Sequence, residues 1–366
     1  MADAGANANV PKKASGSWFG TDVKHCVQCG RGSTKADRAT CKDCGCSEWA
    51  TVDSADGLKA SMVSEAKMMN DMDGKEETGD IVLVCPLSDA LSALSKMVQE
   101  KVDAAKGGER TWEFRGVHLG HGAAAGKTQD DLLTAFLYWA QKPADREAGR
   151  FNVSKAMRRL TAFAIFQEKY CEEFFADPVI VTEPGFANVA KIFPILIPAW
   201  TNKQGNVMWI MDLKQMEADS NVYFSDRVLM RYFWWLMLNS VFDYATAIDG
   251  ADIVETFDGL SFGAMMKMNS KFSKVEKEMQ ELFYGVAPFK MKSCVLVCSP
   301  WWLNWLLAIM RLFISKKMSE RIVNTDKAGM YQRLGGPEFF PQGFYEGTRA
   351  YVDRYQQPAG APKTGP

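Results

Sequence analysis

The sequence predicts an α/β protein in which a small zinc module and a helical subdomain precede a mixed β-sheet with flanking helices. Three observations lead to this prediction: a cysteine-rich stretch near the N-terminus, helical spacing of apolar residues through the middle, and short apolar runs alternating with longer helical stretches after residue 189. A length of 366 residues favours two domains, or one domain with large additions. Hydrophobic content of 47% and charged content of 24% are typical of a folded protein.

The charge balance does not favour nucleic acid as the main partner. The chain carries 43 basic and 44 acidic residues, which gives a net charge of -1. Residues 1–20 lack an apolar core of signal-peptide length, so we expect a cytoplasmic protein with a disordered N-terminal tail. Residues 351–366 are rich in Pro and Gly and predict a second disordered tail.

The cysteines predict a metal site. The stretch HCVQCGRGSTKADRATCKDCGCSEW holds two CxxCG units, and each unit lets two sulfur atoms approach one point. Residues 21–50 resemble a zinc-ribbon module with a structural zinc, and the expected ligands are Cys26, Cys29, Cys41 and Cys44. Cys46 and His25 remain as spare ligands, and an iron site or a redox-active pair are the alternatives. Such a module usually docks on a partner, either a protein or a nucleic acid.

The region before the sheet predicts a linker and then helices. Residues 51–80 show no sustained period and predict a linker or a weakly formed helix. Over 81–180 the apolar spacing predicts a helical subdomain, with Thr128 or Asp130 capping one helix and Asn152 capping the next. GVHLGHGAAAGKT resembles a phosphate-binding loop, but His121 stands where that motif requires glycine, so nucleotide binding is not favoured.

The rest of the chain predicts the sheet. Strands are expected at 189–197, 207–213, 251–257 and 293–298, with the turn TNKQGN joining the first two as a hairpin. Helices are expected over 222–246 and 262–285.

The order of short motifs resembles the CRAL-TRIO lipid-binding and lipid-transfer family over about residues 116–347. Gly259 and Ser261 match a Gly-x-Ser phrase, Pro288 matches the proline of Tyr-Pro, and Pro300 matches the proline after the following strand. The chain departs from the family in the insertion PADREAG and in lacking arginines after the phrase LLTAFL. The resemblance implies a helical N-terminal subdomain over 81–180 and a CRAL-TRIO domain over 181–350 that encloses an apolar lipid pocket.

The stretch SPWWLNWLLAIMRLFISKK predicts a helix too short to span a membrane. From Pro300 to the lysines it reaches about 21 Å, against a bilayer core of ~30 Å. Trp302, Trp305, Leu306, Ile309 and Phe313 are expected to share one face. So wide an apolar arc suits a helix covered by protein on one side and by lipid or another chain on the other, and a core helix is the alternative.

The resemblance implies that residues 301–323, here called the lid segment, form a gate over the pocket, with Lys316 and Lys317 able to meet anionic headgroups. The candidate lipid-binding and gate residues are Trp301, Trp302, Trp305, Ile309, Phe313, Met318, Arg321 and Phe289. Phe289 replaces the family's glutamate, and Met318 and Arg321 replace its Thr-x-x-Lys, which predicts a weaker or different preference than phosphatidylinositol, such as a more apolar ligand.

These expectations define a non-catalytic protein that binds a phospholipid or another hydrophobic molecule and moves it between membranes, associating with them peripherally. Catalysis is not expected, for two reasons. All three histidines precede the pocket domain: His25, His118 and His121. The spacing of residues also indicates no catalytic triad and no carboxylate pair. The alternative is an adaptor, in which the zinc module docks on a partner and the lipid-binding fold serves regulation.

Overall fold

The computed structural model describes most of the chain after residue 62. The described residues are 24–26, 32–33, 49–50, 63–105, 127–176, 179, 183, 185–186, 188–189, 200–213, 225–242, 244–262, 264–265 and 275–344. The chain divides into two units, Met1–Leu58 and Lys59–Pro366.

The first unit contains a three-stranded antiparallel sheet in the order β2-β1-β3. Its strands are β1 (Lys24–Cys26), β2 (Gly32–Ser33) and β3 (Trp49–Ala50). Cys26 ends the central strand and pairs with Trp49. The other three predicted zinc ligands, Cys29, Cys41 and Cys44, lie outside the described residues.

The helical part of the second unit follows the predicted periodicity. Its elements are a helix at 63–71, β4 (Val82–Val84), α2 (Leu87–Ala105), α3 (Gln129–Ala140), α4 (Pro143–Glu147), β5 (Arg150–Asn152) and α5 (Val153–Lys169). Thr128 caps α3 in a reciprocal arrangement with Asp131, and the Asn152 side chain caps α5, as the sequence predicted. The insertion PADREAG forms α4 and the turn that leads into β5, which pairs antiparallel with β4.

Of the two alternatives for residues 51–80, a linker or a weakly formed helix, the described part of this stretch contains a helix. Residues 63–71 form a helix on which Ala66 and Met69 are buried, and Met72 beyond it is fully buried. Asp80 is bound by Arg158 of α5 and by Asn152. The small and polar residues of this segment show no clear helical period in the sequence. Its helix is stabilised by tertiary contacts more than by the helix propensity of its residues.

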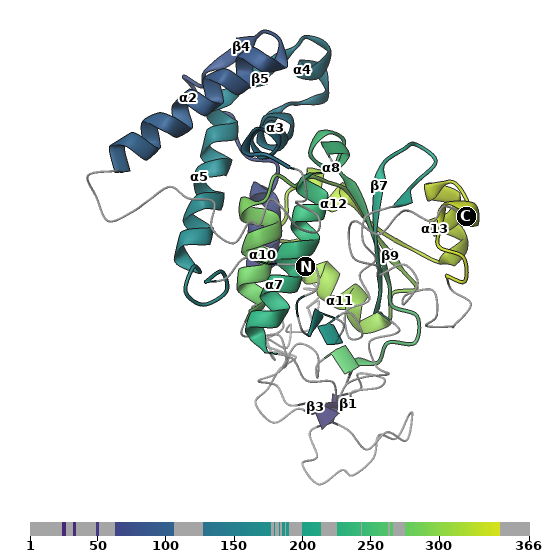
Figure 1. Cartoon of the computed structure of the whole chain (residues 1–366). Helices are drawn as coiled ribbons and strands as arrows, with labels where there is room; N and C mark the ends of the chain where they lie inside the picture. Colours follow the sequence, from purple (N-terminus) through teal and green to yellow (C-terminus); the bar gives the residue numbers. More distant parts are fainter. Residues whose placement is uncertain are drawn as a thin grey trace, which may run out of the picture. The chain divides into compact units, whose positions relative to one another are not determined.

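A five-stranded mixed sheet forms the centre of the second unit, in the order β10-β9-β8-β7-β6 (Figure 1). The strands are β6 (Trp200–Thr201), β7 (Val207–Asp212), β8 (Ala251–Thr256), β9 (Met291–Val297) and β10 (Ile322–Thr325). β7 to β10 are parallel, and β6, which lies after the strand expected at 189–197, pairs antiparallel with β7. The strand expected at 189–197 lies almost entirely outside the described residues.

Helices lie on both sides of this sheet, with α7 and α10 on one side and α13 on the other (Figure 1). The helical elements are α7 (Asp226–Val241), α8 (Tyr244–Ile248), α10 (Glu276–Gln280), the π-helix η3 (Glu281–Val286), α11 (Trp301–Met310), α12 (Lys316–Arg321), α13 (Lys327–Leu334) and the 3₁₀-helix η4 (Pro337–Phe339). On the α13 side, alternate strand residues form a fully buried core with Met330 and Leu334. The opposite face of the sheet is the one that borders the candidate site.

The Gly-x-Ser phrase has a local structural role after β8. Gly259 has a φ of 78°, a left-handed conformation that glycine adopts without a Cβ penalty. Two residues later, the Ser261 hydroxyl accepts a hydrogen bond from the Ala264 amide at 3.1 Å, as a helix cap does. This phrase therefore turns the chain out of the sheet and starts the next helical stretch.

Candidate ligand site

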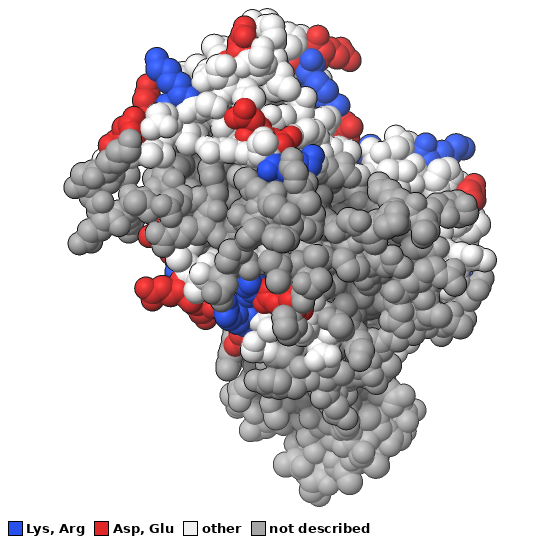
Figure 2. All heavy atoms as spheres, viewed as in Figure 1, with Lys and Arg blue, Asp and Glu red and all other residues white. Residues whose placement is uncertain are grey.

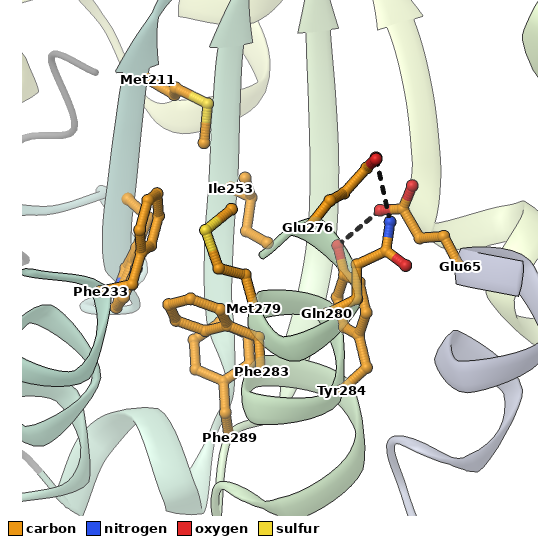
Figure 3. A pocket seen from close by; sticks show the side chains of 11 residues that line it. Glu65, Met211, Phe233, Ile253, Glu276, Met279, Gln280, Phe283, Tyr284 and Phe289 are labelled. Carbon is orange, nitrogen blue, oxygen red and sulfur yellow. Dashed lines mark hydrogen bonds between the residues drawn. The ribbon is translucent and has the colours of Figure 1, made fainter. Parts of the chain in front are cut away.

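A cavity of about 230 Å³ lies between the sheet and the helices that cover it. Eleven residues line it: Glu65, Trp209, Met211, Phe233, Ile253, Glu276, Met279, Gln280, Phe283, Tyr284 and Phe289. Most of this wall is apolar, and Figure 3 shows Phe233, Phe283, Phe289 and Met279 toward one end and Glu65 and Glu276, with Tyr284, at the other. The volume is below the roughly 300 to 1,000 Å³ of pockets that hold drug-sized ligands.

The sheet supplies one wall through the alternation of side chains along a strand. Trp209 and Met211 lie two residues apart on β7 and point to the same face. Ile253 of β8 is paired in register with Trp209, so it points to that face as well. The intervening residues, Ile210 and Val254, face the core on the α13 side.

α10 and η3 supply the opposite wall. Lining residues recur here at Glu276, Met279, Gln280, Phe283 and Tyr284, which is the three-and-four spacing of one helical face. The Phe283 ring meets the Trp209 ring edge-on, with ring centres 5.5 Å apart. Aromatic pairs of this kind contribute about 0.5 to 1.5 kcal/mol beyond the area they bury.

The wall formed by η3 is anchored from behind by Arg159 of α5, a side chain only 6% exposed. Its guanidinium donates hydrogen bonds to the carbonyl oxygens of Tyr284, at 2.9 Å, and Ala287, at 2.8 and 3.0 Å, and it also bonds to the Gly285 carbonyl. The ring of Trp139 covers the guanidinium at 4.7 Å. A buried charge that binds backbone carbonyls in this way holds the end of η3, and so the Tyr284 side chain, in one position.

The polar end of the cavity is acidic. The Tyr284 hydroxyl donates a hydrogen bond to Glu65 Oε1 at 2.9 Å, and the Gln280 amide donates to Glu276 Oε1 at 3.4 Å (Figure 3). Burial raises the pKa of Glu65, and the Tyr284 hydrogen bond only partly offsets this. Glu255 follows Ile253 by two residues on β8, and burial together with the charge of Glu65 raises its pKa to about 7.

No Lys, Arg or His is among the eleven residues that line the cavity. The nearby thiol of Cys294 on β9 is 9% exposed, and burial raises its pKa well above the usual range, so it stays neutral. The site can therefore enclose an apolar body and accept hydrogen bonds at one end.

Phe289 is the predicted site residue that lines the cavity, and its side chain is only 3% exposed. The other seven lie on the lid segment and are not among the lining residues. Trp302 is buried against the Phe257 and Phe262 rings, with ring centres 6.4 and 5.7 Å apart. Met318 is also buried.

The predicted shared face of α11 is split. Trp302 and Leu306 are buried, whereas Trp305 is 39% exposed. Phe313, predicted on the same face, lies in the turn after α11 ends at Met310 and is 42% exposed. A second exposed set on the lid segment consists of Trp301 at 51% and Leu312 at 77%. The helix thus packs on protein on one side and presents apolar side chains on the other, the arrangement expected from its wide apolar arc.

The helix at 63–71 and the turn after it hold the lid segment. Asp73 accepts two hydrogen bonds from the Arg321 guanidinium, at 3.0 and 3.1 Å, and one from Lys317. Burial opposes ionisation of Asp73, but these hydrogen bonds outweigh it and lower the pKa of the carboxyl below its usual value. Asn70 donates to the Phe313 carbonyl at 2.7 Å and accepts from the Ser315 amide at 2.6 Å. We call Asn70 and Asp73, with these partners, the latch.

Sequence reasoning missed Glu65, Asn70 and Asp73 because all three lie in the predicted linker. The available signal was the spacing of Ala66 and Met69 on one helical face, which is too short a run to separate a packed helix from a tether. Arg321, one of the candidate gate residues, binds Asp73 in the structure.

Residues 193–344 match the family model for the CRAL/TRIO domain. This match agrees with the resemblance drawn from the sequence motifs and covers the sheet, η3 and the lid segment. The CRAL/TRIO-like part of the chain thus contains ten of the eleven residues that line the cavity, and Glu65 comes from outside it.

Among solved structures, the chain is similar to one titled "Crystal structure of Sfh5", with a TM-score of 0.42 and 12% sequence identity, over 68% of this chain and 88% of that one. A comparison with curated proteins found no match.

No described helix is long and apolar enough to cross a bilayer. On the face shown in Figure 2, acidic and basic side chains of the described residues are interspersed and do not form a single basic patch. Among the described residues no group of three or more His, Cys, Asp or Glu is placed to hold a metal.

Proposed function

We propose that this protein binds a small hydrophobic molecule in the cavity, without transforming it, and exchanges it with membranes by opening the lid segment. The observation that carries the proposal is an apolar cavity beside a sheet that matches the CRAL/TRIO domain. Each methylene buried in such a wall is worth ~0.8 kcal/mol, so burial alone can draw an apolar ligand out of a bilayer.

The lid segment supports the membrane step. Trp301, Trp305, Leu312 and Phe313 expose apolar surface on one short segment, beside the exposed cation Arg311. Trp side chains favour the membrane interface, where one part of the ring meets lipid and the other meets water. These features support the proposal that the protein associates peripherally with a membrane surface.

Two measurements test the proposal. Native mass spectrometry with lipid extraction should find one hydrophobic molecule per chain after mild purification. Sedimentation with phospholipid vesicles should show weaker binding of Trp301→Ser/Trp305→Ser than of the wild type, with Glu100→Ser on the exposed side of α2 as the matched control. A protein that remains ligand-free after incubation with mixed lipids would contradict the proposal.

We further propose that the first unit holds one structural zinc through Cys26, Cys29, Cys41 and Cys44 and binds a protein partner. Its assignment to a compact unit of its own and the position of Cys26 at the end of a central strand support this. Metal analysis should find one zinc per chain, lost on Cys41→Ser/Cys44→Ser while the ligand content of the cavity is unchanged. If removal of residues 1–58 abolishes partner binding and the full chain never acquires lipid, the adaptor function is favoured.

A further inference from the structure

One segment of the chain contacts both the cavity and the lid segment. Residues 63–73, here called the connecting segment, consist of the helix at 63–71 and the start of the turn after it. Glu65 near its beginning lines the cavity, whereas Asn70 and Asp73 near its end belong to the latch. Glu65 and Asn70 are five positions apart, which is about 7.5 Å along a helix axis. The cavity and the latch are therefore joined by less than two turns of helix.

Tyr284 fixes the cavity end of the connecting segment in two ways. Its hydroxyl donates a hydrogen bond to Glu65 Oε1 at 2.9 Å (Figure 3). Its carbonyl oxygen accepts a hydrogen bond from Arg159 at 2.9 Å, and the Trp139 ring covers that guanidinium. The same ring lies against the turn at Gly74, where a Cβ would come within 2.6 Å of the Trp139 Cη2 atom. The side chain and the main chain of Tyr284 thus both determine where the connecting segment lies.

The connecting segment is packed closely enough to pass a displacement to the lid segment. Ala66 is 0% exposed and Met69 is 4% exposed, and close-packed interiors have low compressibility. At the lid, Asn70 bonds to main-chain groups, the Phe313 carbonyl at 2.7 Å and the Ser315 amide at 2.6 Å. A shift of the connecting segment therefore acts on the backbone of the lid segment.

The wall that carries Tyr284 has an unusual conformation. η3 is a π-helix, a form that is rare in proteins and frequent at functional sites. Phe283 and Tyr284 are adjacent in it and both line the cavity. Since a π-helix is seldom adopted without support, η3 depends on its tertiary contacts, which include those made inside the cavity.

We propose that occupancy of the cavity controls the lid segment through the Tyr284–Glu65 hydrogen bond and the connecting segment. A molecule that fills the cavity holds Tyr284 and Glu65 in the arrangement in which the latch closes, and its departure loosens the latch. Because coupling between two sites is reciprocal, a closed latch also favours the filled cavity. This inference rests on the proposed function, because it describes the regulation of the same cavity.

Tyr284→Phe tests the connection, because it removes the hydroxyl that binds Glu65 and keeps the ring. In hydrogen–deuterium exchange of the full chain without added ligand, peptides covering 311–325 should exchange about tenfold faster than in the wild type. This factor corresponds to one hydrogen bond to a charged group. Tyr170→Phe is the matched control, since its hydroxyl binds a glutamate of α10, Glu278, at 3.3 Å. It should leave the exchange of these peptides unchanged.

Two further measurements show whether the contacts form one path. The double variant Tyr284→Phe/Asp73→Asn should exchange at 311–325 about as fast as Asp73→Asn alone, whereas independent effects would multiply. The probe 1-decanol, at about ten times its Kd, should slow the same peptides of the wild type by up to about tenfold, and by less in Tyr284→Phe. Glu65→Ala removes the acceptor in place of the donor and should accelerate these peptides as Tyr284→Phe does.

The outcomes separate this inference from the proposed function. Equal exchange of 311–325 in Tyr284→Phe and Tyr170→Phe would show that the connection is wrong, and the binding function would stand. The same conclusion follows if calorimetry shows that 1-decanol binds and the exchange of these peptides does not change. If 1-decanol does not bind to a chain that circular dichroism shows to be folded, both proposals are wrong.

Discussion

The latch predicts that Asp73→Asn opens the lid segment. Asp73 is 26% exposed and Arg321 is 19% exposed, so their paired hydrogen bonds are partly shielded from water. The contact with Lys317, whose side chain is 66% exposed, contributes only ~0.2 to 1 kcal/mol. Hydrogen bonds to a charged group contribute ~1.5 to 3 kcal/mol. Asparagine removes the charge but keeps one acceptor oxygen for Arg321, so we expect local stability to fall by ~2 kcal/mol.

A loss of ~2 kcal/mol corresponds to about a thirtyfold rise in the population of the open lid. Hydrogen–deuterium exchange measures this directly, because amides that exchange through local opening accelerate by the same factor. Peptides covering residues 311–325 should exchange about thirtyfold faster in Asp73→Asn, while those of β7 and β8 should not change. Asp71→Asn is the control, since Asp71 is 67% exposed and contacts Lys75 only at 3.5 Å. Equal exchange in both variants would refute the role of the latch.

Two further predictions concern the site's buried charges. Glu255 has a pKa of about 7 in the fold against an ordinary 4.5, so its contribution to stability is complete below pH 4.5 and is lost as the pH rises to 7. The free energy of unfolding of Glu255→Gln should therefore exceed that of the wild type by up to ~3 kcal/mol at pH 8 and should equal it at about pH 4.5. Urea unfolding at both pH values measures this difference. A difference that does not change with pH would contradict the prediction. Arg159→Met removes the hydrogen-bond donors to three backbone carbonyls at the end of η3, so it should destabilise the protein by ~3 kcal/mol or more and abolish ligand binding. Arg311→Met, at an exposed position, is the control. Equal melting temperatures for the two variants would contradict the prediction.

Much of the sheet could be predicted from the sequence because its central strands are rich in apolar residues. Residues 207–213, 251–257 and 293–298 correspond to β7, β8 and β9 within two residues at either end. Parallel strands covered on both faces need apolar side chains throughout, so the local composition reports their burial. The caps at Thr128 and Asn152 were equally local, since a cap involves residues only three positions apart.

The cavity's polar end and the latch were decided by the tertiary structure. Glu65 meets Tyr284 across 219 positions of sequence, and Asp73 meets Arg321 across 248. Periodicity shows which residues avoid water, but it does not show which distant element covers them. The sequence by itself therefore determined the strands, the caps and the apolar character of the lid segment. Only the folded chain determined that the helix at 63–71, which lies outside the matched domain, completes the site with Glu65. Long-range packing and charge pairing stabilise that helix more than its local propensity does.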